Sequence, residues 1–101
     1  MSKILNLGID ISLQTATCSF LSQDGKFHGK PFDVDNNLPG FEILKQKITA
    51  LCFLEGYTDV NIGLEASSNY GFHLLSYFSN IHIDGVKFHL YQINAKYINT
   101  L

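Results

Sequence analysis

Runs of apolar residues bounded by turn-forming residues divide the chain into its predicted elements. Two runs have the same form: residues 4–10 and 60–65 are mostly aliphatic, and each ends in Gly, an aliphatic residue and an acid, namely Asp10 and Glu65. Short aliphatic runs of this kind are typical of strands buried on both faces, which lack the alternation of half-exposed strands. The pattern therefore predicts two inner strands that each end in a carboxylate.

The stretch after the first strand indicates a meander of three strands. Residues 15–21 are rich in β-branched, small and aromatic residues, which suit a second strand. Asp24-Gly25 is a tight-turn dipeptide, so residues 26–32 are expected to return as the third strand, antiparallel to the second. Pro31 lacks a ladder donor and therefore favours an edge position for this strand.

A first helix is predicted after the polar, loop-like residues 33–37. Asn37 is a good helix cap, and Gly56 suits the C-terminal cap. Between them, large apolar residues recur at the helical spacing, at Phe41, Leu44, Ile48, Leu51 and Cys52.

The second half of the chain repeats the alternation of strand and helix. After residues 60–65, a second helix is expected to begin at Ser67, Ser68 or Asn69, and one of its faces carries Tyr70, Leu74, Tyr77, Phe78 and Ile81. Residues 87–93 read as a fifth strand. Asn94 suits the cap of a third helix, of which residues 95–101 would be the first turns.

The resulting order is β-β-β-α-β-α-β plus a helix stub, an α/β fold with a mixed five-stranded sheet and flanking helices. Strands one, four and five should run parallel, and the meander should extend the other side of strand one. Strands one and four are then neighbours at a topological switch point, where ligands of open α/β sheets bind. Asp10 and Glu65 are accordingly predicted to form one site.

Length and composition bound the class of protein. One hundred and one residues suffice for one small domain, and 46% hydrophobic content indicates a folded core. The net charge is −2 and the basic residues are seven lysines without an arginine, which disfavours autonomous nucleic-acid binding. No apolar run approaches the roughly 20 residues of a membrane span, so we expect a cytoplasmic protein. Cys18 and Cys52 read as reduced core thiols.

Four segments, in this order and spacing, resemble the N-terminal RuvC-like domain of DEDD-type transposases of the "one-ten" insertion-sequence family, which are similar also to Piv-type DNA invertases. The segments are Leu7-Gly8-Ile9-Asp10-Ile11-Ser12, residues 32–44, residues 62–70 and Leu90-Tyr91-Gln92-Ile93-Asn94-Ala95. The resemblance covers essentially the whole chain and implies a ribonuclease H-like fold. Ser68 departs from it, because the family usually has Gly there.

The resemblance further implies metal-dependent phosphoryl transfer on DNA during transposition. Asp10 matches the first acid of the DEDD set and Glu65 the second, so both would act as catalytic ligands of Mg²⁺ or Mn²⁺. The third and fourth acids, in an Asp-x-x-Asp pattern, and a serine of a separate domain do not occur in the sequence. Residues 1–101 are thus expected to be the N-terminal part of a truncated RuvC-like domain that binds metal weakly and is inactive alone. Partners implied by the resemblance are DNA and a guide RNA.

Other polar residues near the predicted site have two readings. Ser12, Ser67 and Tyr70 are candidates for contacts with substrate or with the metal ligands, although the serines equally suit local backbone bonds and the tyrosine a packing role. The remaining aspartates fall in predicted loops and read as solvated turn residues: Asp24, Asp33, Asp35, Asp59 and Asp84.

Two other classes of function remain open from the sequence. Sugar kinases and actin-like ATP-binding proteins also begin with a strand that ends in Gly-Ile-Asp, but they place glycine in the following turn to hold phosphate, and residues 11–15 contain none. Alternatively, the chain is a non-catalytic remnant that acts only by association. Large apolar groups on both faces of the fifth strand predict self-association of the isolated chain.

Overall fold

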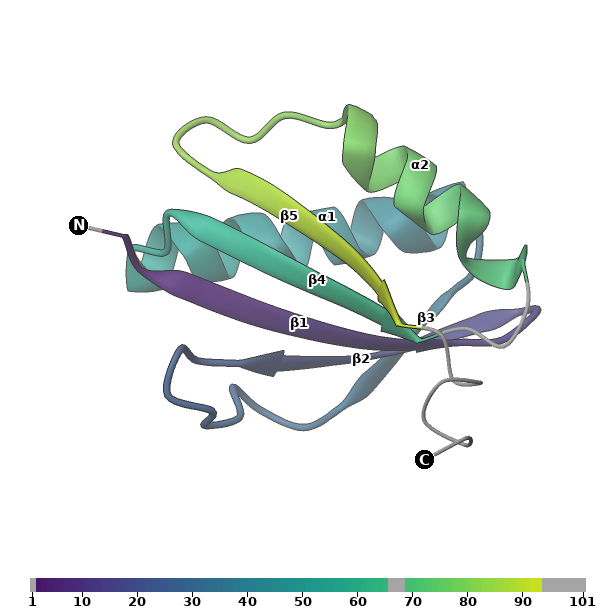
Figure 1. Cartoon of the computed structure of the whole chain (residues 1–101), viewed down its shortest axis with the longest axis horizontal. Coiled ribbons are helices and arrows are strands. Elements are labelled where there is room, and N and C mark those ends of the chain that lie inside the picture. The colour runs from purple at the N-terminus through teal and green to yellow at the C-terminus, as the bar shows by residue number, and fades with distance from the viewer. Residues whose placement is uncertain (1, 66–68, 94–101) are drawn as a thin grey trace.

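The structure is a computed structural model that describes residues 2–65 and 69–93 (Figure 1). Its elements are β1 (Ile4–Ile11), β2 (Thr15–Leu21), β3 (Phe32–Asp35), α1 (Leu38–Glu55), β4 (Asp59–Glu65), the short 3₁₀ helix η1 (Asn69–Gly71), α2 (Phe72–Asn80) and β5 (Lys87–Ile93). This order confirms the predicted succession of strands and helices. The predicted helix over residues 95–101 and its cap at Asn94 lie outside the described residues.

The five strands form one mixed sheet of order β3-β2-β1-β4-β5. The pairs β1–β2 and β2–β3 are antiparallel, and the pairs β1–β4 and β4–β5 are parallel. From β1 the chain builds the meander on one side and returns through α1 to β4 on the other side. The predicted switch point between β1 and β4 is therefore present.

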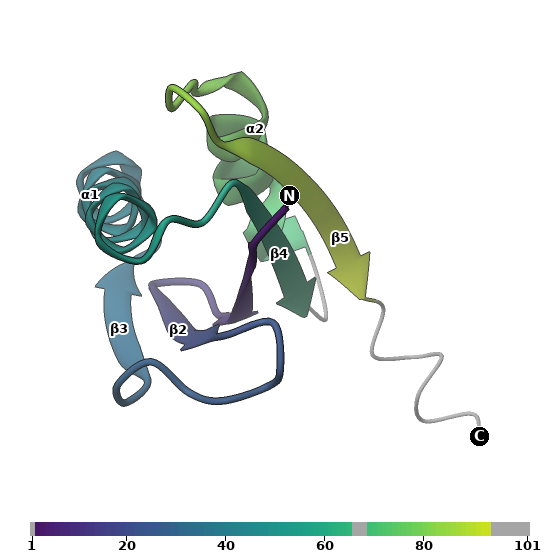
Figure 2. The ribbon, with the colours of Figure 1, turned by 90° about the vertical axis from the view of Figure 1, so that its left-hand side faces the viewer.

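Both helices cover the same face of the sheet, which curls around α1 (Figure 2). The core lies between the sheet and the two helices. Leu5, Leu7, Val60 and Ile62 of the inner strands pack there with helix side chains such as Ile48 and Phe78. On β1 and β4 buried residues alternate with exposed or half-buried ones, so the prediction of strands buried on both faces is wrong. Apart from Ile4, the alternate positions on the other face hold small or polar residues, and no described element covers this face.

Helix α1 begins and ends as its sequence predicts. The Asn37 side chain accepts a hydrogen bond from the Gly40 amide at 3.0 Å, which satisfies one of the free donors of the first turn. Gly56 closes the helix in the left-handed conformation, with φ of 77°. A buried stripe runs along its length: Gly40, Phe41, Leu44, Ile48 and Cys52.

The third strand lies later in the chain than predicted. β3 is Phe32–Asp35, whereas residues 26–31 form a loop in which only Phe27 makes an isolated bridge, to Leu21. Gly29 has φ of 76°, which turns the chain away from the ladder, and Pro31 has no donor with which to rejoin it. The acids that follow Phe32 consequently lie on a strand and not in a loop. Asp59 is likewise the first residue of β4.

Helix α2 also begins later than predicted. Residues 69–71 form a 3₁₀ turn, and the α-helix starts at Phe72 after Gly71, with no side-chain cap. A Cβ atom on Gly71 would lie 2.3 Å from Leu64 Cδ2, so a larger residue here would displace the Leu64 side chain. The buried residues Leu74 and Phe78 confirm two positions of the predicted apolar face.

Both cysteines are buried and unpaired, as predicted. Burial raises the pKa of both thiols, that of Cys18 to about 12. Among residues 2–65 and 69–93, no helix has the length and apolar character needed to cross a membrane.

Candidate metal centre

Asp10 and Glu65 lie side by side at the carboxyl ends of β1 and β4. They are register partners in the parallel β1–β4 ladder. Partners in such a ladder project to the same face of the sheet, and here it is the face that neither α1 nor α2 covers. Both side chains are exposed. The prediction that topology brings these two acids together on adjacent strands is thus confirmed.

Two glycines flank the acids and leave the sheet surface flat. Gly8 and Gly63 are the register partners two residues before Asp10 and Glu65, on the same face. A Cβ atom at either glycine would have no neighbour within 4 Å. One step further back, the Asn61 side-chain amide donates to Asn6 Oδ1 at 3.2 Å. The carboxylates therefore border open space in which a ligand is not obstructed by this part of the chain.

A third acid lies in the same row across the sheet. Asp10 pairs with Thr17 of β2, and Thr17 pairs with Asp33 of β3, so the row runs from Asp33 through Thr17 and Asp10 to Glu65. The Thr17 hydroxyl donates to Asp33 Oδ1 at 2.7 Å. Our sequence reading missed Asp33 because it placed the residue in a loop. The alternation Phe-Asp-Val-Asp from residue 32 was the signal for a strand with acids on one face.

The other sequence candidates have different surroundings. The Ser12 hydroxyl is used locally, since it accepts from the Thr15 amide at 3.3 Å and lies 3.1 Å from the Thr15 carbonyl oxygen. Tyr70 is exposed, in the short helix that follows β4. Ser67 lies outside the described residues, so its reading as a contact residue stays a prediction.

The donor atoms suit a hard divalent cation only in part. Carboxylate oxygens are the preferred ligands of Mg²⁺, which retains several waters in most protein sites. Asp10 and Glu65 supply two such groups from adjacent strands. Among the described residues, no cluster of three or more His, Cys, Asp or Glu side chains is close enough to enclose a metal ion. The pair thus fits an open, water-rich site of low affinity.

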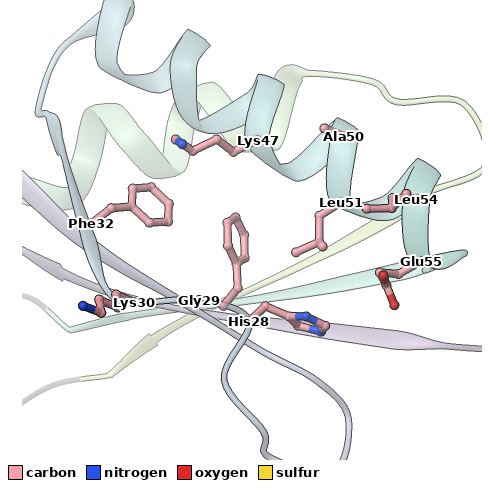
Figure 3. Close-up of a pocket in the computed structure, with 10 residues that line it drawn as sticks. His28, Gly29, Lys30, Phe32, Lys47, Ala50, Leu51, Leu54 and Glu55 are labelled. Atoms are coloured by element: carbon pink, nitrogen blue, oxygen red, sulfur yellow. The ribbon is translucent and has the colours of Figure 1, made fainter.

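A hollow of about 640 Å³ lies elsewhere, between α1 and residues 28–30 (Figure 3). Its wall includes Phe32, Leu51 and Leu54, and the Lys47 ammonium lies 5.0 Å from the centre of the Phe32 ring. Lys47, Leu51 and Leu54 belong to α1, and Phe32 lies on the strand that α1 packs against. The hollow therefore does not contribute to the surface around Asp10 and Glu65.

A mixed sheet of this order, with helices on one face and acids paired at the ends of β1 and β4, defines an α/β domain of the ribonuclease H-like class. The family described as transposase, with the DEDD signature of the "one-ten" insertion sequences, matches residues 7–99. The chain belongs to this transposase family. No curated protein matches its sequence.

Solved structures add a likeness of fold. Pelota from Archaeoglobus fulgidus superposes with a TM-score of 0.51 at 10% identity, over 91% of this chain and 27% of that chain. A Ppx/GppA family member from Aquifex aeolicus gives a TM-score of 0.38 at 13% identity, over 87% of this chain and 35% of that chain. This chain thus spans about a quarter of the length of Pelota, and at 10% identity the likeness concerns the fold alone.

Proposed function

We propose that the chain is the N-terminal part of the RuvC-like catalytic domain of a DNA transposase. The observation that carries the proposal is the register pairing of Asp10 with Glu65 on the open face of the sheet, in a chain of the transposase family. In such a domain the two carboxylates hold a divalent cation, Mg²⁺ or Mn²⁺. The cation supplies charge stabilisation for phosphoryl transfer on DNA.

The residues of this chain contribute position and charge to that chemistry. Asp10 and Glu65 present their oxygens from two rigid, hydrogen-bonded strands, which fixes their spacing better than loops would. Gly8 and Gly63 keep the adjacent surface low, so a DNA backbone can approach the carboxylates without meeting side chains from those positions. The partners of the whole transposase would be DNA and a guide RNA, and the protein would be cytoplasmic.

The turn after Asp10 does not favour the alternative of an ATP-binding domain. Phosphate loops offer free backbone amides to the ligand. Here the Ser12 amide donates to the Thr15 carbonyl at 2.8 Å, and the Thr15 amide donates to the Ser12 hydroxyl. Two donors that a phosphate would need are therefore already used within the turn.

Metal binding by the 101-residue chain tests the proposal. A cation that binds the folded state with a Kd of order 1 mM stabilises it by about 1.4 kcal/mol at roughly 10 mM. For a domain of this size that corresponds to a rise in melting temperature of about 6–11 °C. We expect such a rise with Mg²⁺ or Mn²⁺, and we expect it to vanish in the double variant Asp10→Asn, Glu65→Gln.

Asp59→Asn is the matched control, because Asp59 lies on the same strand as Glu65 but at its opposite end. This variant should keep the full metal-dependent rise. A rise that survives in the double variant would show that the cation binds elsewhere. We also expect no DNA cleavage by the isolated chain, and metal-dependent cleavage that Asp10→Asn abolishes would contradict this expectation.

A further inference from the structure

The Asn36 side chain connects the turn that follows Asp10 with Tyr70, which follows Glu65 in the chain. Asn36 follows β3 directly, and its amide nitrogen donates to the carbonyl oxygens of Ser12 at 3.0 Å and Leu13 at 3.3 Å. The same nitrogen donates to the carbonyl oxygen of Tyr70 at 3.0 Å. Ser12 lies two residues after Asp10, and Tyr70 lies five residues after Glu65.

The backbone of Asn36 adds a contact to the same turn. Its amide donates to the Gln14 carbonyl at 2.9 Å. All three residues between β1 and β2, at positions 12, 13 and 14, are therefore bonded to Asn36. One residue at the end of β3 thus fixes the whole turn that follows Asp10.

The chemistry of these contacts requires a hydrogen-bond donor in the side chain at position 36. Three carbonyl oxygens face the same nitrogen, so only a donor group can occupy its place, and the flipped amide would set oxygen against oxygen. The remaining oxygen, Asn36 Oδ1, is buried and has no hydrogen-bond partner among the described residues. An unpaired buried acceptor destabilises the folded state, and the hydrogen bonds of the nitrogen, whose two hydrogens are shared among the three carbonyl oxygens, offset that cost.

We propose that Asn36 is a positioning residue for the Asp10–Glu65 metal centre, because it bonds both to the turn after Asp10 and to Tyr70, five residues after Glu65. The inference rests on the proposed metal function. Residues that orient metal ligands without binding the metal themselves typically contribute to metal affinity, which falls by about 10–100-fold when they are replaced. The hydrogen bonds of the Asn36 side chain go to Ser12, Leu13 and Tyr70 and not to the acids, so its effect on the acids is indirect.

The test is a Mg²⁺ titration of the folded chain, followed by the backbone amide signals of Asp10 and Glu65 in nuclear magnetic resonance. Asn36→Ala should weaken Mg²⁺ binding by about tenfold. Asn61→Ala is the matched control, since Asn61 also bridges two segments by its side-chain amide but lies four residues before Glu65. It should leave the affinity within about twofold of the unchanged chain. If the role of Asn36 were purely structural, Asn36→Ala would lower the melting temperature but would not change the Mg²⁺ affinity measured at temperatures well below melting.

A second readout does not depend on metal. The Ser12 amide is held by the Thr15 carbonyl, and its hydrogen exchange should become about tenfold faster in Asn36→Ala if the turn is released. Should Asn36→Ala fail to fold, Asn36→Ser, which keeps one donor, takes its place in both measurements.

The outcomes separate this inference from the proposed function. Unchanged Mg²⁺ binding in the Asp10→Asn, Glu65→Gln double variant would refute the metal site, and the role of Asn36 would fall with it. Loss of binding in the double variant together with normal binding in Asn36→Ala would overturn the role of Asn36 alone. Equal weakening by Asn36→Ala and Asn61→Ala would also overturn it, because the effect would then be a general loosening of the fold.

Discussion

Gly40 provides a sharp test of the packing that places β3 against α1. A Cβ atom at this position would lie 1.9 Å from the carbonyl oxygen of Asp35 and 2.7 Å from its carbonyl carbon. Ordinary contacts of a Cβ atom begin near 3.4 Å. Gly40→Ala therefore forces the first turn of α1 away from the end of β3, because the obstacle is backbone and cannot rotate aside.

Two effects of opposite sign compete in this substitution. Replacing a helical glycine by alanine stabilises a helix by up to about 1 kcal/mol. Overpacking of this severity costs about 3 kcal/mol, and displacement of the first turn also weakens the Asn37 cap, worth about 1 kcal/mol. We therefore expect a net loss of about 3 kcal/mol in the free energy of unfolding, a large part of the 5–15 kcal/mol typical of a domain.

Urea unfolding followed by circular dichroism measures this loss. With a slope near 1.5 kcal/mol per M, the midpoint should fall by about 2 M. Gly63→Ala is the matched control, because the added Cβ would meet nothing within 4 Å, and its midpoint should change by less than about 0.7 M. An unchanged or higher midpoint for Gly40→Ala would refute the close approach of the two backbones.

Three further outcomes are expected. Burial and a hydrogen bond to Glu42 raise the pKa of Tyr77 from 10.0 to about 12, so the folded state holds this proton more tightly than the unfolded chain. Its contribution to stability should be complete below pH 10 and lost towards pH 12, and Tyr77→Phe should flatten that decline in thermal melts. Because burial raises the pKa of both thiols, Cys18 and Cys52 should resist a disulfide reagent at pH 8 in the folded chain and react at once in urea; rapid reaction without denaturant would contradict their burial. Finally, β5 is an edge strand among the described strands and exposes Tyr91, which favours self-association. The average molecular mass from light scattering should therefore rise with protein concentration and be lower in Tyr91→Lys. A constant monomer mass would refute self-association.

The sequence predicted those features whose causes are local or follow from general topology. The cap at Asn37 and the end at Gly56 each depend on one residue type in a short stretch. The pairing of Asp10 with Glu65 needed only two similar strand ends and the rule for a switch point. The caps are therefore encoded locally, whereas the pairing of the two acids follows from the order of the elements.

The errors arose where a glycine acts through its surroundings. At position 29 the left-handed backbone turns the chain away from the ladder, so β3 begins only at Phe32. Asp33 therefore lies on the sheet and not in the predicted loop. At position 71 the missing Cβ makes room for the Leu64 side chain, and α2 begins at the next residue, later than the sequence predicts. A glycine in a sequence signals conformational freedom but does not say which neighbour requires it.

Asn36 illustrates the limit of such reading most clearly. Its side-chain partners are three backbone carbonyl groups that lie 24, 23 and 34 residues away in the chain. Carbonyl oxygens are the same in every residue type, so no pattern of side chains at those positions indicates the contact. The acids themselves show their chemistry in the sequence, whereas the residue that holds the segments beyond them is found only when the strands are in place. A metal centre at strand ends depends both on the ligating acids and on residues that support the neighbouring backbone. The strands set the positions of the ligands, and the supporting residues limit how far the ligands can move.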